Sequence, residues 1–256
     1  MAGSIARRQI IVTADDVGLH PGMTQGAIRG HREGIVTACS VVANGMAFDD
    51  AIARLRDVPT LEVGVHLTLV EERPLTKMRF PKKYTTFAPL YLARIITMTA
   101  IERELRAQIE RVLATGLRVT HLNGHQHLHV LPRLFALVAR LACEYHIGYV
   151  RIVDDLGGGE RALAMRALSA LGRRARAPFT NDHTIGVANA GHLRDVVPLL
   201  DHVRGVTELV THPGIGVSGY GWGYAWDEET RALCDPALRE ELARRGIELI
   251  APSARG

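Results

Sequence analysis

Hydrophobic positions along the chain alternate between the period of a strand and the period of a helix. Eight short apolar runs, rich in β-branched residues, are typical of buried parallel strands. These runs are residues 9–13, 40–43, 61–70, 118–122, 149–153, 184–187, 207–211 and 247–251. Stretches with helical periodicity lie between them, at residues 47–56, 100–113, 132–145, 162–174, 192–203 and 236–245. The alternation predicts an α/β fold, a (β/α) TIM-like barrel in regular or distorted form, with a doubly wound open sheet as the main alternative.

The organisation of the chain indicates one domain. No linker or change in composition divides residues 1–256. Two long connections, residues 71–99 and 212–227, interrupt the alternation, and the second contains Tyr220, Trp222, Tyr224 and Trp226. Long connections in a compact domain tend to be functional, and in barrels the connections that follow strands build the active site.

The composition is that of an ordinary globular protein, with 47% apolar and 23% charged residues. The charges sum to only +4, and the densest basic run, residues 161–176, has the spacing of a solvated helix face. We find no nucleic-acid-binding motif, and no apolar stretch approaches the roughly 20 residues that span a bilayer. Neither nucleic acid nor a membrane is therefore expected as a partner.

The three cysteines, Cys39, Cys143 and Cys234, are far apart and lack CxxC spacing. This distribution argues against a disulfide framework and against a thiolate metal site. Residues 1–8 lead directly into an apolar run without the hydrophobic segment of a secretory signal. A cytoplasmic location is the simplest expectation.

Two adjacent aspartates, Asp15 and Asp16, follow the first predicted strand. Buried carboxylates are costly unless they are paired, and adjacent side chains on an extended backbone point to opposite sides. The two aspartates therefore need different partners, for example a metal ion for one and a transferred proton for the other. A helix N-cap is the simpler alternative, because aspartate is favoured at that position.

A run of histidines provides the strongest chemical signal. His121, His125, His127 and His129 fall within nine residues, and their spacing places them with Asn123 on one face of an extended backbone. Imidazoles gathered so closely are favoured when they surround a divalent ion. A solvated edge strand, or a cluster bonded to carboxylates, is the alternative.

Single histidines lie at the ends of two further strands. His66 is near the end of the third predicted strand, and His212 follows the seventh. Taken alone, His66 is typical of a hydrogen-bonded core residue, and His212 fits either an acid or base role or a turn residue. In a parallel barrel the carboxyl ends of the strands meet at one rim, so these histidines and the aspartates are expected to converge.

Five motifs occur in order: Thr13-Ala-Asp-Asp-Val-Gly18, Gly34-Ile-Val-Thr-Ala38, Gly64-Val-His-Leu67, Thr120-His-Leu-Asn-Gly-His-Gln-His-Leu-His129 and Thr211-His-Pro-Gly214. In this combination the sequence resembles the YdjC-like carbohydrate deacetylases over residues 9–251, nearly the whole chain. The resemblance implies a barrel-like fold related to polysaccharide deacetylases and a single metal-dependent domain. It also implies hydrolysis of an N-acetyl group on an amino sugar or oligosaccharide.

Matched position by position, the resemblance implies Asp16, His66 and His125 as metal ligands, Asp15 as the base and His212 as the acid. The sequence departs from the family pattern at two positions. Val17 replaces a common phenylalanine, which alters packing, and Asn123 replaces the usual aspartate of the histidine run. The second change removes a carboxylate that would orient a ligand histidine, so a lower or altered metal affinity is expected.

The residue types also give expectations for the ion and the substrate. Two imidazoles and one carboxylate suit zinc better than magnesium, which prefers oxygen ligands, although the family is often described with magnesium. For sugar binding we expect Arg151, at the end of the fifth predicted strand, together with His127 and Trp222. A homodimer that buries some of the apolar helices fits the composition.

Two other functions fit the same residues. A histidine-rich rim also serves metal-dependent phosphoesterases, and a non-catalytic sugar-binding protein would retain the fold. Turnover of phosphate esters would identify the first, and oligosaccharide binding without acetate release would identify the second.

Overall fold

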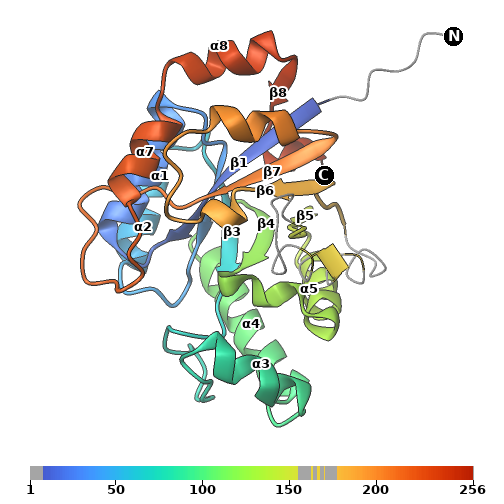
Figure 1. Ribbon diagram of the computed structural model, residues 1–256. Coiled ribbons are helices and arrows are strands. Elements are labelled where there is room, and N and C mark those ends of the chain that lie inside the picture. The colour runs from blue at the N-terminus through green and yellow to red at the C-terminus, as the bar shows by residue number, and fades with distance from the viewer. Residues whose placement is uncertain (1–7, 155–162, 164–165, 168–169, 171–177, 256) are drawn as a thin grey trace, which may run out of the picture.

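A single sheet of eight parallel strands forms the centre of the molecule in the computed structural model (Figure 1). The structure describes residues 8–154 and 178–255, together with residues 163, 166, 167 and 170. The strands are β1 (Arg8–Val17), β2 (Ala38–Val41), β3 (Glu62–Leu67), β4 (Val119–Gly124), β5 (Tyr149–Val150), β6 (His183–Ile185), β7 (Val206–Thr211) and β8 (Ile247–Leu249). All eight overlap the strands predicted from the sequence.

Helices follow most of the strands and pack against them. They are α1 (Pro21–Glu33), α2 (Phe48–Leu55), α3 (Tyr84–Leu92), α4 (Met98–Leu113), α5 (Pro132–Glu144), α7 (Trp226–Leu233) and α8 (Ala237–Arg244). Helix α1 contacts both α2 and α7, and these three lie together at one end of the sheet, whereas α4 and α5 contact β3 and β4 (Figure 1). Among the described helices, none combines the length and apolar character needed to cross a bilayer.

Fewer of the predicted helices than of the predicted strands are confirmed. Helices α2, α4, α5 and α8 confirm four of them, but the helix expected at 192–203 is reduced to the 3₁₀ helix η3 (Val197–His202). The helix expected at 162–174 and most of the basic run 161–176 lie outside the described residues. Helix α1 was not predicted, because the glycines along it lower helix propensity.

Those glycines allow α1 to approach the segment that carries His212. A Cβ atom on Gly26 would collide with the backbone of Gly214, and one on Gly22 would collide with Ile215. The Gly22 carbonyl also accepts a hydrogen bond from the Ile215 N–H at 3.0 Å. Close packing of backbone on backbone, rather than periodicity, therefore explains this helix.

The strands follow one another in the order of a barrel, but among the described residues the sheet does not form a continuous closed ladder. Its order is β5-β4-β3-β2-β1-β7-β6, so β5 and β6 are the two edges and do not pair with each other among the described residues. Both strands are short, of two and three residues, so they offer few backbone hydrogen bonds with which to close the sheet into a barrel. The expectation of a parallel α/β fold is confirmed. A full TIM barrel is not, because between β5 and β6 the described residues show only a parallel bridge from Tyr149 to Phe179, with the Val150 N–H donating to the Phe179 carbonyl at 2.9 Å.

The last strand is displaced from its place in a regular barrel. Residues 9 and 10 of β1 pair with both β7 and β8, and residues 13 and 14 pair with both β7 and β2. Strands β8 and β2 therefore share one edge of β1, which is long enough at ten residues to hold both. The central strand β1 consequently has neighbours along its whole length.

Alternation along β1 separates two environments. Ile10, Val12 and Ala14 belong to the main core with the helices, whereas Ile11 belongs to a small cluster inside the curved sheet. Thr13 and Asp15 continue the face of Ile11, where both are buried. The interior of the sheet is thus apolar near the start of β1 and polar near its carboxyl end.

A buried carboxylate ties the connection after β7 to α7. Glu229, in the first turns of α7, accepts a hydrogen bond from the His212 N–H at 2.5 Å. Burial raises the pKa of Glu229 to about 8, against the backbone N–H groups of His212, Leu193 and Gly191, which favour the ionised form. The folded protein therefore holds a proton on this group that the unfolded chain releases near pH 4.5.

This pKa predicts a pH dependence of stability. The contribution of Glu229 is fully present below pH 4.5 and is lost as the pH rises to about 8, because the folded state retains the proton longer. In Glu229→Gln the contribution is absent, so the unfolding free energy of the wild type should fall relative to the variant by up to about 1.4 kcal/mol per pH unit. Urea denaturation between pH 5 and pH 8 measures the difference, with Glu228→Gln as the matched control. Parallel stability curves for wild type and Glu229→Gln would contradict the assignment.

Candidate metal centre and active site

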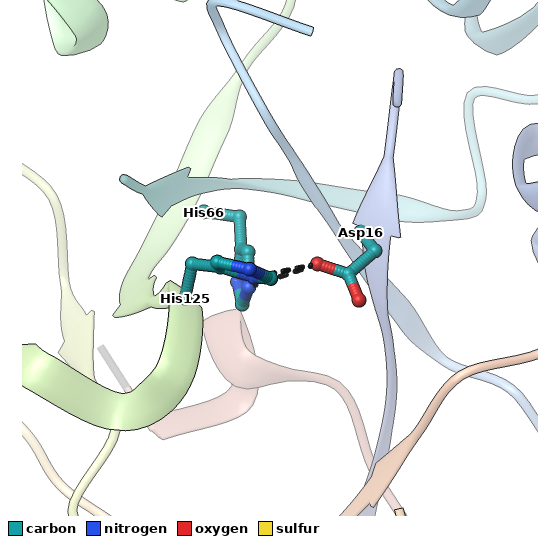
Figure 2. A group of neighbouring side chains, drawn as sticks. All are labelled: Asp16, His66 and His125. Atoms are coloured by element: carbon teal, nitrogen blue, oxygen red, sulfur yellow. Dashed lines mark hydrogen bonds and ion pairs between the residues drawn. The ribbon is translucent and has the colours of Figure 1, made fainter. Parts of the chain in front are cut away.

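Three buried side chains form the centre of the site (Figure 2). Asp16 comes from the end of β1, His66 from β3 and His125 from the start of the 3₁₀ helix η1 (His125–Val130). His125 Nδ1 is 3.0 Å and His66 Nε2 3.3 Å from Asp16 Oδ1, and one donor atom from each residue lies within 4.8 Å of the others. The fold therefore brings together the three residues predicted to be metal ligands.

A break in the regular geometry of β1 brings Asp16 into this group. The pairing register of β1 with β2 shifts between Ala14 and Val17, and Asp16 has a φ of 63°. Aspartate tolerates this left-handed conformation better than most residues. The two adjacent carboxylates consequently reach the same cavity, instead of pointing to opposite sides as an extended backbone would require. The expectation of different partners is confirmed.

Asn123 sets the orientation of His66. The two residues are opposite each other on β4 and β3, and His66 Nδ1 donates a hydrogen bond to Asn123 Oδ1 at 2.8 Å. The amide of Asn123 donates to Asp15 Oδ1 at 3.0 Å, and since a carboxylate only accepts, its oxygen must face His66. The amide thus supplies the acceptor expected from an aspartate, without placing a second carboxylate beside Asp15.

This orientation leaves a place for a cation. When Nδ1 carries the only ring proton, His66 presents the Nε2 lone pair to Asp16 Oδ1 at 3.3 Å. Two acceptors that face each other in a buried site repel unless a positive charge lies between them. Two imidazoles and one carboxylate are also a common donor set for divalent transition metals. The residues present therefore fit a divalent ion held by Asp16, His66 and His125.

His125 lies between two carboxylates. Its Nδ1 faces Asp16, and its Nε2 is 3.1 Å from Glu71 Oε2. Burial alone would lower the pKa of His125, but Asp16 and Glu71 together raise it to about 10. Asp16 is affected in the opposite direction, since His125 and His66 outweigh its burial and hold its pKa well below the usual range. The carboxylates of Asp16 and Glu71 therefore favour positive charge at the position of His125.

The predicted histidine face is wrong beyond Gly124, where β4 ends. Gln126 and His127 have φ values of 51° and 55°, so the backbone turns and the following histidines take different directions. The histidines before and after this turn also have different partners. His121, on β4, contacts Ser40 Oγ at 3.0 Å, whereas His129 Nε2, after the turn, donates to the Arg151 carbonyl. Burial lowers the pKa of His121 to about 4 and that of His129 to about 3, as for neutral core imidazoles.

A buried ion-pair network holds Asp15. Arg151 donates to both Asp15 oxygens, at 2.5 and 2.9 Å, and to Glu208 Oε1 at 2.8 Å, and all three side chains are fully buried. Glu208 also accepts from Thr13 Oγ1 and the Tyr149 hydroxyl. Burial alone would raise the pKa of Asp15, but the Arg151 guanidinium outweighs it and holds that pKa well below its usual range. Asp15 is therefore ionised and fixed in position.

The geometry of Arg151 does not fit the substrate contact expected from the sequence. Its side chain has no exposed surface, and its guanidinium is engaged by Asp15 and Glu208. A sugar hydroxyl in the cavity would compete with two carboxylates for these donors. In the structure, Arg151 instead neutralises the buried carboxylates of Asp15 and Glu208 beneath the cavity.

His212 lies on the other side of Asp16. It directly follows β7, and its Nε2 is 3.9 Å from Asp16 Oδ2. Its ring lies edge-on to Tyr224, with 5.4 Å between centroids. Burial lowers the pKa of His212, although Asp16 and Asp15 oppose the shift. The fold therefore brings the predicted acid into the same site as the predicted ligands and base.

These groups open into one cavity of about 250 Å³. It is lined by Asp15, Asp16, His66, Tyr84, His125, Gln126, His127, Val187, Ala188, Ala190, His212 and Tyr224. His127, predicted to bind substrate, is half-buried in this wall, and its Nδ1 has no hydrogen-bond partner among the described residues. Trp222 is not in the lining, but its ring packs on His125 at 5.6 Å and on Tyr224 at 5.5 Å between centroids.

Three residues near the ligands carried no recognised sequence motif. Glu71 contacts His125, Tyr84 lines the cavity, and Glu208 binds Arg151. Glu71 begins, and Tyr84 lies within, the long connection 71–99 that the sequence marked as functional, and Glu208 interrupts the apolar run of β7. A charged residue inside a buried strand was the signal for Glu208.

The chain is similar to proteins of one family along nearly its whole length. A family model described as YdjC-like protein matches residues 9–244. A curated protein of Brevibacillus brevis named carbohydrate deacetylase is 29% identical over 97% of this chain and 100% of its own. One of Geobacillus stearothermophilus with the same name is 31% identical over 95% of this chain and 96% of its own.

A solved structure has a similar fold. It is a protein of Enterococcus faecalis named for cellobiose-phosphate cleavage, with a TM-score of 0.81 and 23% identity, and the match covers 97% of this chain and 99% of that one. Since the family model extends from β1 to α8, the chain belongs to the YdjC-like protein family.

Proposed function

We propose that the protein is a metal-dependent carbohydrate deacetylase that hydrolyses the N-acetyl group of an amino sugar or oligosaccharide. The observation that carries the proposal is the shared cavity of Asp16, His66 and His125 with a second carboxylate, Asp15. The curated relatives named carbohydrate deacetylase support the same reaction. A cytoplasmic location and a homodimer stay predictions from the sequence.

Zinc is the proposed ion, with magnesium as the second choice, because imidazole donors favour the former. Asp16, His66 and His125 would hold such an ion, which would supply a lowered pKa of water, towards about 7, and an electrophile for the acetyl carbonyl. Asn123 fixes the ring of His66 for this role through the bond to Nδ1. The protein contributes a cavity in which these groups need little rearrangement.

Asp15 is the proposed proton acceptor. Its lowered pKa makes it a weak base towards ordinary water, so it suits a water molecule whose acidity is already raised. Both of its oxygens accept bonds from Arg151, which fixes the carboxylate without removing it from the cavity lining. His212, across Asp16 from the other imidazoles, is the proposed donor to the departing amine.

The cavity wall favours a neutral sugar over a phosphate ester. The lining contains histidines, tyrosines and small apolar residues but neither lysine nor arginine among the described residues. Phosphate dianions are usually bound by such cations or by helix N-termini. Tyr224 and His127 are therefore proposed to contact the sugar, with Trp222 packing behind them. This composition weighs against the phosphoesterase alternative.

Acetate release tests the proposed reaction directly. Metal-stripped protein is incubated with N-acetylglucosamine oligosaccharides, and zinc, magnesium, manganese or cobalt is added back. We expect acetate only in the presence of an ion, and most with zinc. Tight metal binding with no acetate from any acetylated sugar would contradict the proposal, and turnover of phosphate esters would favour the alternative.

Substitution separates proton transfer from metal binding. Asp15→Asn should lower kcat by about 10²- to 10⁴-fold, as expected for loss of a general base, while zinc affinity measured by calorimetry is retained. His125→Ala should lose both zinc and turnover. Because Asp15 neutralises buried Arg151, thermal unfolding of Asp15→Asn must be checked at the assay temperature. Wild-type turnover in folded Asp15→Asn would exclude the assigned role.

The aromatic connection gives a further prediction. Trp222→Ala should raise KM more than it lowers kcat, because the ring supports the wall of the cavity and not the reacting groups. Steady-state kinetics on a soluble oligosaccharide measure the two constants, and zinc affinity serves as the control for contact with His125. A drop in kcat at unchanged KM would rule out a binding role for Trp222.

A further inference from the structure

Glu71 is the residue on which the connection after β3 meets the metal centre. Its Oε2 lies 3.1 Å from His125 Nε2, and its Oε1 accepts a hydrogen bond from the Gln126 side-chain amide, also at 3.1 Å. One carboxylate therefore binds two consecutive residues at the point where the backbone leaves β4. Its side chain is 27% exposed, so these bonds are partly shielded from water.

Backbone strain concentrates at the same place. Six non-glycine residues have positive φ among the described residues: Asp16, Glu71, Arg94, Gln126, His127 and His146. Four of them lie at the metal centre: Asp16, Gln126 and His127 line its cavity, and Glu71 contacts His125. Such conformations persist only where surrounding contacts enforce them, and they cluster at functional sites. The bonds from Glu71 to His125 and Gln126 are contacts of this kind.

Glu71 is held on a well-anchored segment. Its backbone N–H donates to the Lys82 carbonyl at 3.0 Å. A few residues later, the backbone N–H groups of Leu75 and Thr76 both donate to the buried carboxylate of Glu104 on α4, each at 2.9 Å. The start of the long connection is therefore anchored at Glu71 itself and again at Leu75 and Thr76, which suits a group that must orient another side chain.

We propose that Glu71 is a positioning residue for the metal ligand His125. By accepting the Nε2–H, its carboxylate fixes the ring and directs the Nδ1 lone pair towards the point shared with Asp16 and His66. Carboxylates that bind the outer nitrogen of a ligand histidine typically contribute 10- to 100-fold in metal affinity. The proposal rests on the metal site of the proposed function, but not on the identity of the substrate.

The neighbouring Glu72 provides a matched control. It carries the same charge on the same segment, but its side chain lines a different cavity, beside Met46 and Tyr220. No hydrogen bond from Glu72 to His125 or Gln126 is formed among the described residues. Comparing the two positions therefore separates the hydrogen bond to His125 from the general effect of a nearby negative charge.

The test measures zinc affinity of the full chain by isothermal titration, without substrate. Glu71→Ala should weaken zinc binding by about 10- to 100-fold. Glu71→Gln keeps an oxygen that accepts the Nε2–H, so it should retain part of that affinity, and Glu72→Ala should change it by less than about threefold. Proton–nitrogen NMR of the histidine rings adds a second readout: the His125 Nε2–H should exchange slowly in the wild type and rapidly in Glu71→Ala.

Three results would overturn the proposal. They are wild-type zinc affinity in Glu71→Ala, an equal loss in Glu72→Ala, and an equal loss in Glu71→Gln and Glu71→Ala, which would show that accepting the Nε2–H contributes nothing. Thermal unfolding in the presence of a chelator shows whether each variant is folded before zinc is added. Because no substrate enters this test, failure of the deacetylase assay leaves its result intact.

Discussion

Burying two adjacent carboxylates at the end of a central strand costs several kcal/mol for each ion unless opposite charge or hydrogen bonds offset it. Asp15 and Asp16 meet this requirement with separate partners: Arg151 for the first, and the imidazoles of His66 and His125 for the second. The shift in pairing register near the end of β1 makes the separation possible, because it turns Asp16 towards the cavity that Asp15 already faces. Most other features of the site follow from this division of charge.

The division also explains how one site can hold a cation and a proton acceptor side by side. Arg151 is paired with Glu208 as well as with Asp15, so its positive charge is neutralised inside the sheet and does not face the proposed ion. Asn123 joins the two halves, since its amide donates to Asp15 and its oxygen accepts from His66. The amide of Asn123 is therefore the hydrogen-bonded link between the proposed base and a proposed metal ligand.

Much of this arrangement could be predicted from the sequence, and the errors have physical causes. Strands were found because buried parallel strands are continuous apolar runs, and Asp16, His66 and His125 were matched by motif and converge because parallel strands end at one edge. Barrel closure was not predictable from such runs, since it depends on the short strands β5 and β6. The turn after Gly124 and the burial of Arg151 depend on tertiary contacts with Glu71 and Glu208, distant in sequence, which periodicity cannot reveal.

The two aspartates have different partners, and Asp16 is the one proposed to bind the ion. Anomalous diffraction at the zinc edge from crystals of zinc-loaded protein tests this assignment most directly. We expect one strong peak bound by Asp16, by Nε2 of His66 and by Nδ1 of His125, with Asp15 still paired to Arg151. A peak bound by Asp15, or one remote from all three ligands, would contradict it.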